Sequence, residues 1–73
     1  MILTFVDVQE PVLNVYQLEA ENPPPVGEIY DFGLPRGNRM YGTWIVLSVE
    51  RLAHYNVQAD TLRVNIVRIN ILR

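Results

Sequence analysis

Residues 41–50, YGTWIVLSVE, decide the fold class of this chain. Successive side chains of an extended strand point to opposite faces. One face therefore carries Tyr41, Thr43, Ile45, Leu47 and Val49, and the other carries Trp44 and Val46. A strand that is apolar on both faces is usually covered on both faces. The stretch predicts a central β-strand, and the segments on either side of it are the candidates for its neighbours.

The composition of the whole chain favours strands over helices. Its 73 residues include 19 Val, Ile and Thr residues but only three Ala, and β-branched side chains fit a pleated surface better than a helix. Working outward, we expect strands at about 2–8, 12–18, 26–32 and 62–72, a strand or short helical turn at 51–57, and a turn at 58–61. A helix over residues 11–21 competes with the strand at 12–18, because Pro11 suits a first helical position.

The last strand predicts a bend. Leu62, Val64 and Ile66 alternate with polar residues, but after Val67 the apolar phase moves to Ile69 and Ile71. Side chains of period two change face only where a residue is inserted, so we expect a β-bulge near Ile66-Val67. The chain is therefore expected to form one all-β domain over residues 1–73. It would be a small SH3-like or OB-like barrel, or a curled antiparallel meander of five to six strands.

The residue inventory argues against catalysis. There is no cysteine, and the single histidine, His54, has no neighbours at a spacing typical of metal ligands. The only serine, Ser48, falls inside the predicted central strand rather than in a nucleophile turn. We expect no enzymatic activity, no metal and no cofactor. The chain also lacks a signal-peptide pattern and an apolar run long enough to span a membrane, which favours the cytoplasm.

The formal net charge of −2 hides a division along the chain. Residues 1–35 carry six acidic residues and no basic one, whereas residues 36–73 carry six arginines and two acidic residues. There is no lysine, and arginine differs from lysine in its planar fork, which pairs with carboxylate or phosphate and stacks on aromatic rings. Ordinary pairing with carboxylates of the same chain, such as Glu19, Glu21 or Glu28, would also use these arginines.

The loop at 33–40 is the first candidate binding site. Arg36 and Arg39 lie among turn-forming residues, Tyr41 follows directly, and Trp44 lies just beyond Gly42. Arginine forks can bind phosphate, and an aromatic ring offers a stacking face. A nucleotide, a nucleic-acid phosphate or an acidic protein surface would fit this chemistry, while the alternative is an ordinary solvated hairpin loop.

The predicted last strand is the second candidate. It carries a series of arginine and asparagine side chains: Arg63, Asn65, Arg68, Asn70 and Arg73. On a sheet surface, Arg63 and Arg68 could contact nucleic acid, where arginine and asparagine bind phosphates and bases. The acidic balance of the chain argues against non-specific nucleic-acid binding, and pairing with nearby carboxylates is the structural alternative.

Self-association is the firmest expectation beyond the fold class. The two apolar faces of residues 41–50 and the pair Ile71-Leu72 offer more apolar surface than one thin core can bury. Strand pairing between subunits would also remove an unpaired sheet edge. The sequence therefore predicts a homo-oligomer.

Several short motifs follow one another along the chain: Pro24-Pro25-Val26-Gly27-Glu28, Gly42-Thr43-Trp44-Ile45-Val46, then Val49, His54 and a β-rich last strand. This series resembles the pattern of uncharacterised small β-barrel proteins of phages and mobile elements. The loop at 33–40 is longer than in that pattern. The resemblance implies a small β-barrel and a viral source, and it supplies no catalytic residue.

Together these observations predict a binding protein. In one form, a phage-encoded oligomer inhibits a host protein through its arginines. In another, it sequesters a small phosphate ligand, such as a nucleotide, near Arg36, Arg39 and Trp44. The alternative from another class is a nucleic-acid-binding small β-barrel that uses Arg63 and Arg68.

Overall fold

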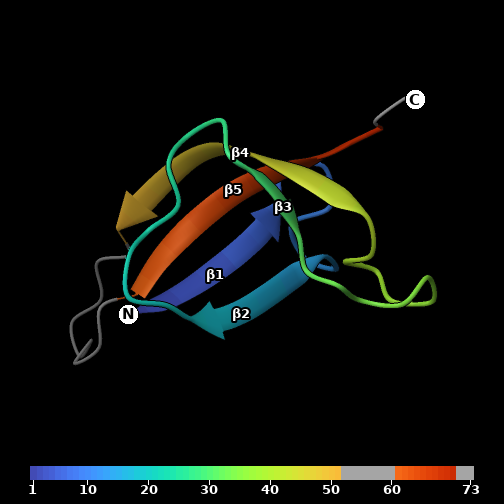
Figure 1. The fold of residues 1–73 in the computed structure, drawn as a ribbon, viewed down its shortest axis with the longest axis horizontal. Coiled ribbons are helices and arrows are strands. Elements are labelled where there is room, and N and C mark those ends of the chain that lie inside the picture. Colours follow the sequence, from blue (N-terminus) through green and yellow to red (C-terminus); the bar gives the residue numbers. More distant parts are fainter. Residues whose placement is uncertain (52–60, 71–73) are drawn as a thin grey trace.

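The computed structural model describes residues 1–51 and 61–70 (Figure 1). Within these ranges the regular structure is all β, as the composition predicted. The five strands are β1 (Ile2–Asp7), β2 (Val15–Glu19), β3 (Ile29–Asp31), β4 (Thr43–Arg51) and β5 (Thr61–Ile69). Of the predicted segment at 51–57, residues 52–57 lie outside the described residues, as do residues 58–60 of the predicted turn at 58–61.

The strands form one curled mixed sheet with the order β2-β1-β5-β4-β3. β1 and β5 run parallel, while the other three neighbouring pairs are antiparallel. The expectation of a small barrel-like all-β fold is confirmed. A simple antiparallel meander is not formed, because the first and last strands meet in the middle of the sheet and place the two ends of the chain's regular structure side by side.

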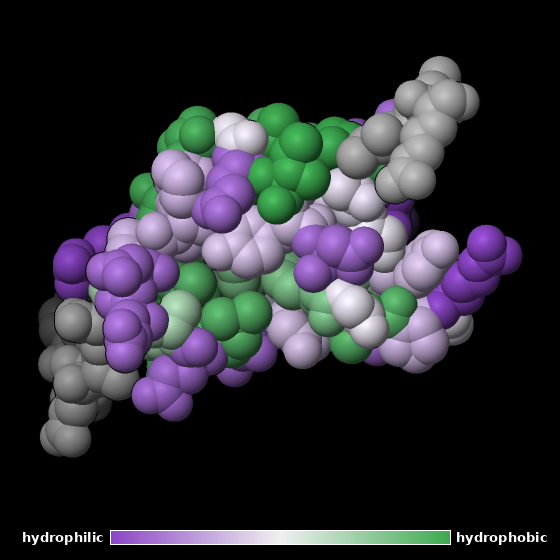
Figure 2. All heavy atoms as spheres, viewed as in Figure 1, coloured by the Kyte–Doolittle hydropathy of each residue, from purple (hydrophilic) through white to green (hydrophobic). Residues whose placement is uncertain are grey.

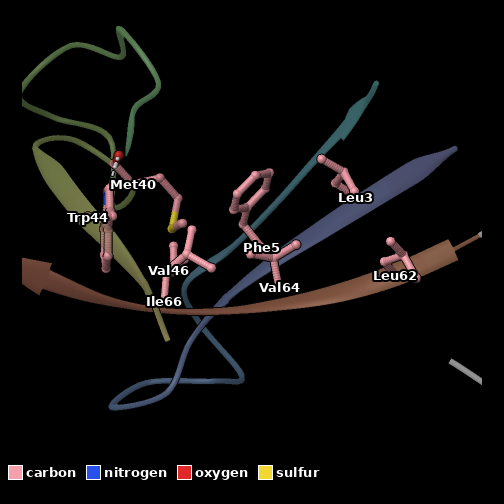
Figure 3. Close-up of a cluster of buried hydrophobic side chains, with 8 residues drawn as sticks. All are labelled: Leu3, Phe5, Met40, Trp44, Val46, Leu62, Val64 and Ile66. Carbon is pink, nitrogen blue, oxygen red and sulfur yellow. Dashed lines mark hydrogen bonds between the residues drawn. The ribbon is translucent and has the colours of Figure 1, made fainter. Parts of the chain in front are cut away.

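The core lies on the inner face of the curled sheet. Cross-strand pairing places Phe5 next to Val64 and Val46 next to Ile66, and these four side chains are almost completely buried. Figure 3 shows the core as a row, with Trp44 and Met40 at one end and Leu3 and Leu62 at the other. The apolar alternation of the predicted last strand therefore identified the β5 contribution to this core.

The bulge lies in β4 and not in the last strand. Val46 pairs with Ile66, but the next pair along is Ser48 with Asn65, so Leu47 is the extra residue. β5 continues without an insertion, which leaves Arg68 on the same face as Ile66. The change of apolar phase in the sequence has another cause: beyond Ile66 the outer face of β5, rather than its inner face, carries the apolar residues.

An aromatic cluster closes the open side of the half-barrel. β2 and β3 are the two edges of the sheet, yet the rings of Tyr16 on β2 and Phe32 just after β3 lie 4.8 Å apart between centroids. The ring of Phe5 contacts both Phe32, at 4.9 Å, and Tyr30, at 5.2 Å. Burial, with a smaller effect from the carboxylate of Glu28, raises the pKa of Tyr30 above its ordinary value. The edges are thus joined by side chains instead of backbone hydrogen bonds.

The turn between β1 and β2 explains why residues 11–21 do not form a helix. Asp7 is buried, and its carboxylate accepts hydrogen bonds from the backbone N–H of Gln9 at 3.0 Å and from Nδ2 of Asn14 at 2.9 Å. The backbone N–H of Asp7 also donates to the carbonyl of Asn14 at 3.0 Å. These bonds fix residues 8–14 as a tight connection, so β2 begins at Val15 and pairs back on β1 as predicted.

Candidate functional site

The candidate site is the connection between β3 and β4, residues 33–42, which we call the arginine loop. Its own residues form successive turns. The N–H of Asn38 donates to the carbonyl of Pro35 at 2.9 Å, and the N–H of Tyr41 donates to the carbonyl of Asn38 at 3.0 Å. The side-chain Oδ1 of Asn38 accepts the N–H of Met40 at 2.8 Å. The loop therefore has a defined backbone shape and is not an unstructured tip.

Two side chains of the sheet hold three consecutive carbonyl groups of this loop. The guanidinium group of Arg68 donates from Nη2 to the carbonyl of Arg39 at 2.7 Å and from Nη1 to the carbonyl of Tyr41. Between them, Nε1 of Trp44 donates to the carbonyl of Met40 at 3.1 Å. The planar fork of arginine suits this two-point binding, which a lysine could not reproduce. Arg68 is thus a positioning residue for the loop.

Trp44 belongs to the core and offers no stacking face in this structure. Its side chain is 0% exposed, and the guanidinium carbon of Arg68 lies 4.1 Å from the centroid of its ring. Trp44 and Arg68 are cross-strand partners on the inner face of β4 and β5. The predicted role of Trp44 as a ligand-contacting ring does not fit this placement, because burial and Arg68 already occupy its surface.

Gly42 allows the close approach of Arg68. Its φ of 103° lies in a region that residues with a side chain rarely adopt. A Cβ atom at this position would lie 2.8 Å from Nη1 of Arg68. Gly42 therefore lets the chain enter β4 while the guanidinium group reaches the two carbonyls.

The side chains of Arg36 and Arg39 are exposed on this fixed backbone. Throughout residues 1–51 and 61–70, neither guanidinium group makes a hydrogen bond, ion pair or ring contact. Tyr41, which is also exposed, lies in the same loop. Arg36, Arg39 and Tyr41 are thus exposed on one loop, in which Arg68 binds the carbonyls of Arg39 and Tyr41.

The second predicted site is divided between two faces of the sheet. Arg63 lies on the outer face of β5, where its Nε donates to Oδ1 of Asn65 at 2.8 Å. Asn65 in turn donates to the hydroxyl of Ser48 at 2.9 Å. Arg68 lies on the inner face, because β5 contains no inserted residue. Arg63 and Arg68 therefore do not form one ladder, and Arg73 lies outside the described residues.

The outer face of the sheet carries an apolar stripe that the sequence only partly indicated. Ile29, Ile45 and Val67 are cross-strand neighbours on β3, β4 and β5, and Ile29 is 55% exposed. Leu47 at the bulge is also exposed. Figure 2 shows hydrophobic surface gathered along the upper border of the molecule. The predicted surplus of apolar surface on residues 41–50 thus exists, although Trp44 and Val46 contribute nothing to it.

Residues 1–51 and 61–70 form neither a metal-binding cluster nor a membrane-spanning helix. Among those residues, no group of three or more His, Asp or Glu side chains is placed to hold a metal ion. In the same ranges there is no helix with the length and apolar character needed to cross a membrane. Ser48 lies on β4 as a hydrogen-bond acceptor, and His54 lies outside the described residues.

Comparisons with known proteins identify no family for this chain. No protein-family model matches it, and neither the curated proteins nor the solved structures contain a significant match. The arginine loop is therefore the feature from which a function is inferred.

The sequence indicates the loop as a candidate site but does not indicate that Arg68 fixes its backbone. Arg68 lies 24 positions after Trp44, which is its cross-strand partner. An arginine in register with a tryptophan on an adjacent predicted strand is the signal that could have found it, but that register depends on the bulge at Leu47.

Proposed function

We propose that this chain is a binding protein that presents Arg36 and Arg39 to an anionic surface of a protein partner. One observation carries the proposal. Both guanidinium groups are exposed and, in the described ranges, unpaired, on a loop whose backbone is held by Arg68, Trp44 and Asn38.

The ordered backbone matters for affinity. A flexible loop loses conformational entropy when it binds, and a loop that already has its bound shape avoids much of this cost. Each arginine can bind a carboxylate through two parallel N–H···O bonds. The arrangement therefore supports recognition of paired carboxylates by preordered forks, which is binding chemistry rather than catalysis.

The burial of Trp44 leaves Tyr41 as the exposed ring of the loop. A nucleotide site would use such a ring to stack on the base as well as the arginines to bind phosphate, whereas an acidic protein surface needs the two arginine forks alone. The resemblance to small phage proteins would make the partner a host protein, inhibited by occlusion of its acidic surface. Recognition of carboxylates requires no further group from this chain.

The test uses defined anionic probes. The 15N-labelled protein is titrated with an acidic octapeptide of Asp and Glu, and separately with ATP and with a short single-stranded DNA, while amide shifts are followed by NMR. We expect the peptide to shift residues of the arginine loop. The variant Arg36→Gln/Arg39→Gln should weaken this binding about tenfold or more, because it removes two charge-assisted contacts.

Arg63→Gln removes one positive charge from the outer face of β5, so it is the control for the single variants Arg36→Gln and Arg39→Gln, each of which should weaken peptide binding at least about threefold. Arg63→Gln should leave the peptide affinity within about twofold, as expected for a distant surface charge that is screened by salt. Peptide binding that is absent, or that Arg63→Gln weakens as much as the single loop variants do, would overturn the proposal. Loop shifts with ATP or DNA but not with the peptide would overturn the assignment of the partner.

A further inference from the structure

The free edge of β2 has an arrangement of backbone groups that is complementary to itself. In the antiparallel pair with β1, Asp7 donates to the carbonyl of Asn14 at 3.0 Å, and Ala20 and Met1 exchange hydrogen bonds of 2.9 Å. Hydrogen-bonded positions alternate along an antiparallel strand. The even-numbered residues of β2 therefore face β1, and the N–H and C=O groups of Val15, Gln17 and Glu19 point away from the sheet.

These outward groups have no backbone partner among the described residues. β2 is the last strand on its side of the sheet, and the aromatic contact of Tyr16 with Phe32 joins it to the other edge through side chains alone. An unpaired strand edge is a template for pairing with another chain.

The two edges of the sheet differ in their protection. β3 has only three residues, and three prolines precede it at 23–25. Short edges and prolines are the usual protection against edge pairing. β2 has five residues with no proline, no bulge and one charged side chain, Glu19. The β3 edge is therefore protected against pairing with another strand, and the β2 edge is not.

We infer that β2 pairs with β2 of a second copy of this chain, antiparallel and centred on Gln17. In this register Gln17 faces Gln17 of the second copy, and Val15 faces Glu19 of the second copy. Each of these is a hydrogen-bonded position, so every outward N–H and C=O of the three residues finds a partner. The symmetry is that of an isologous dimer, in which the same patch serves both subunits.

The side chains fit the same register. No two charged residues face each other, because Glu19 faces Val15, which is 42% exposed in the single chain. On the inner face, Tyr16 lies beside Leu18 of the second copy, and both are half-buried here. Aromatic and aliphatic cross-strand pairs stabilise a sheet. The pairing thus extends the apolar face as well as the hydrogen-bond ladder, and it does not rest on the function proposed for the arginine loop.

The test compares two variants that introduce opposite charges at position 15. Sedimentation velocity from about 10 µM to about 1 mM should show a reversible monomer–dimer equilibrium, because association depends on protomer concentration. Val15→Lys places a cation opposite Glu19 of the second copy, and Val15→Glu places a like charge there. Since each dimer contains this pair twice, we expect the Val15→Glu dissociation constant to exceed that of Val15→Lys at least about fivefold.

The pair Ile29→Lys and Ile29→Glu on β3 is the matched control, because it changes the net charge by the same amounts on the other edge. These two variants should differ less than about twofold. The fluorescence of Trp44 and thermal unfolding confirm that each variant is folded. A monomer at every concentration would overturn the inference. So would equal constants for the two position-15 variants, or a larger difference at position 29.

Discussion

Arg68→Ala should destabilise the protein although Arg68 is a solvent-exposed charged residue. Its guanidinium group binds the carbonyls of Arg39 and Tyr41 and covers the ring of Trp44 at 4.1 Å. A hydrogen bond from a charged group contributes about 1.5–3 kcal/mol when buried, so we take about 1 kcal/mol for each of these exposed ones. An exposed cation–π contact adds about 0.5 kcal/mol. We therefore expect a loss of about 2.5 kcal/mol in the free energy of unfolding.

Urea unfolding, followed by far-UV circular dichroism and by the fluorescence of Trp44, measures this loss. Trp44 is the only tryptophan of the chain, and its emission should move to longer wavelength in the native state once Arg68 no longer covers the ring. Arg68→Lys should lose about 1 kcal/mol, because an ammonium group keeps the cation over the ring but cannot bind both carbonyls through one planar fork.

Arg36→Ala is the control, since it also removes one arginine near the same loop. Its side chain has no partner in the described part of the chain, so the stability should stay within about 0.5 kcal/mol. A cost of less than about 0.5 kcal/mol for Arg68→Ala, or one no larger than that of Arg36→Ala, would contradict this role of Arg68. In that case the loop would hold its shape without the contacts from β5.

Three further changes test the same structure. Gly42→Ala should cost about 1–3 kcal/mol by urea unfolding, from the positive φ and the 2.8 Å approach to Arg68, whereas Gly37→Ala, with open space around it, should be neutral. Asp7→Asn should lower the melting temperature by about 10 °C, because one buried acceptor becomes a donor; an unchanged melting temperature would contradict this. The pKa of Tyr30 in the folded state is raised above its ordinary value of 10.0. The stability that its neutral phenol contributes is therefore present below pH 10 and is lost as the pH rises through the raised pKa. Tyr30→Phe should flatten that alkaline loss of stability, and an unchanged profile would count against it.

The sequence predicted the individual strands well because side-chain alternation is a local property. The apolar positions of residues 62–66 indicated the β5 core residues, and Trp44 and Val46 were placed together on the other face of the central strand. The strand at 12–18 was preferred over a helix, and β2 begins at Val15. β3 is shorter than the predicted strand at 26–32, because a turn at Gly27, with a φ of 89°, precedes it.

The candidate site was predicted only in its loop. Arg36, Arg39 and Tyr41 are exposed together, as their spacing in a turn-rich segment indicated. A bulge in the last strand, which the apolar phase change predicts, would place Arg63 and Arg68 on one surface. The inserted residue is Leu47 in β4. The sequence of β5 alone does not show whether β5 or its partner β4 carries an extra residue.

The amino-acid sequence by itself therefore determined the β class, the approximate strands and the exposed loop, because these follow from propensity and period along a few neighbouring residues. The tertiary structure alone decided that β1 lies parallel to β5, that Arg68 holds the loop over a buried Trp44, and that β2 is left as the long open edge. Each of these depends on contacts between residues far apart in the chain, and such contacts follow from the packing of the whole sheet rather than from any local pattern.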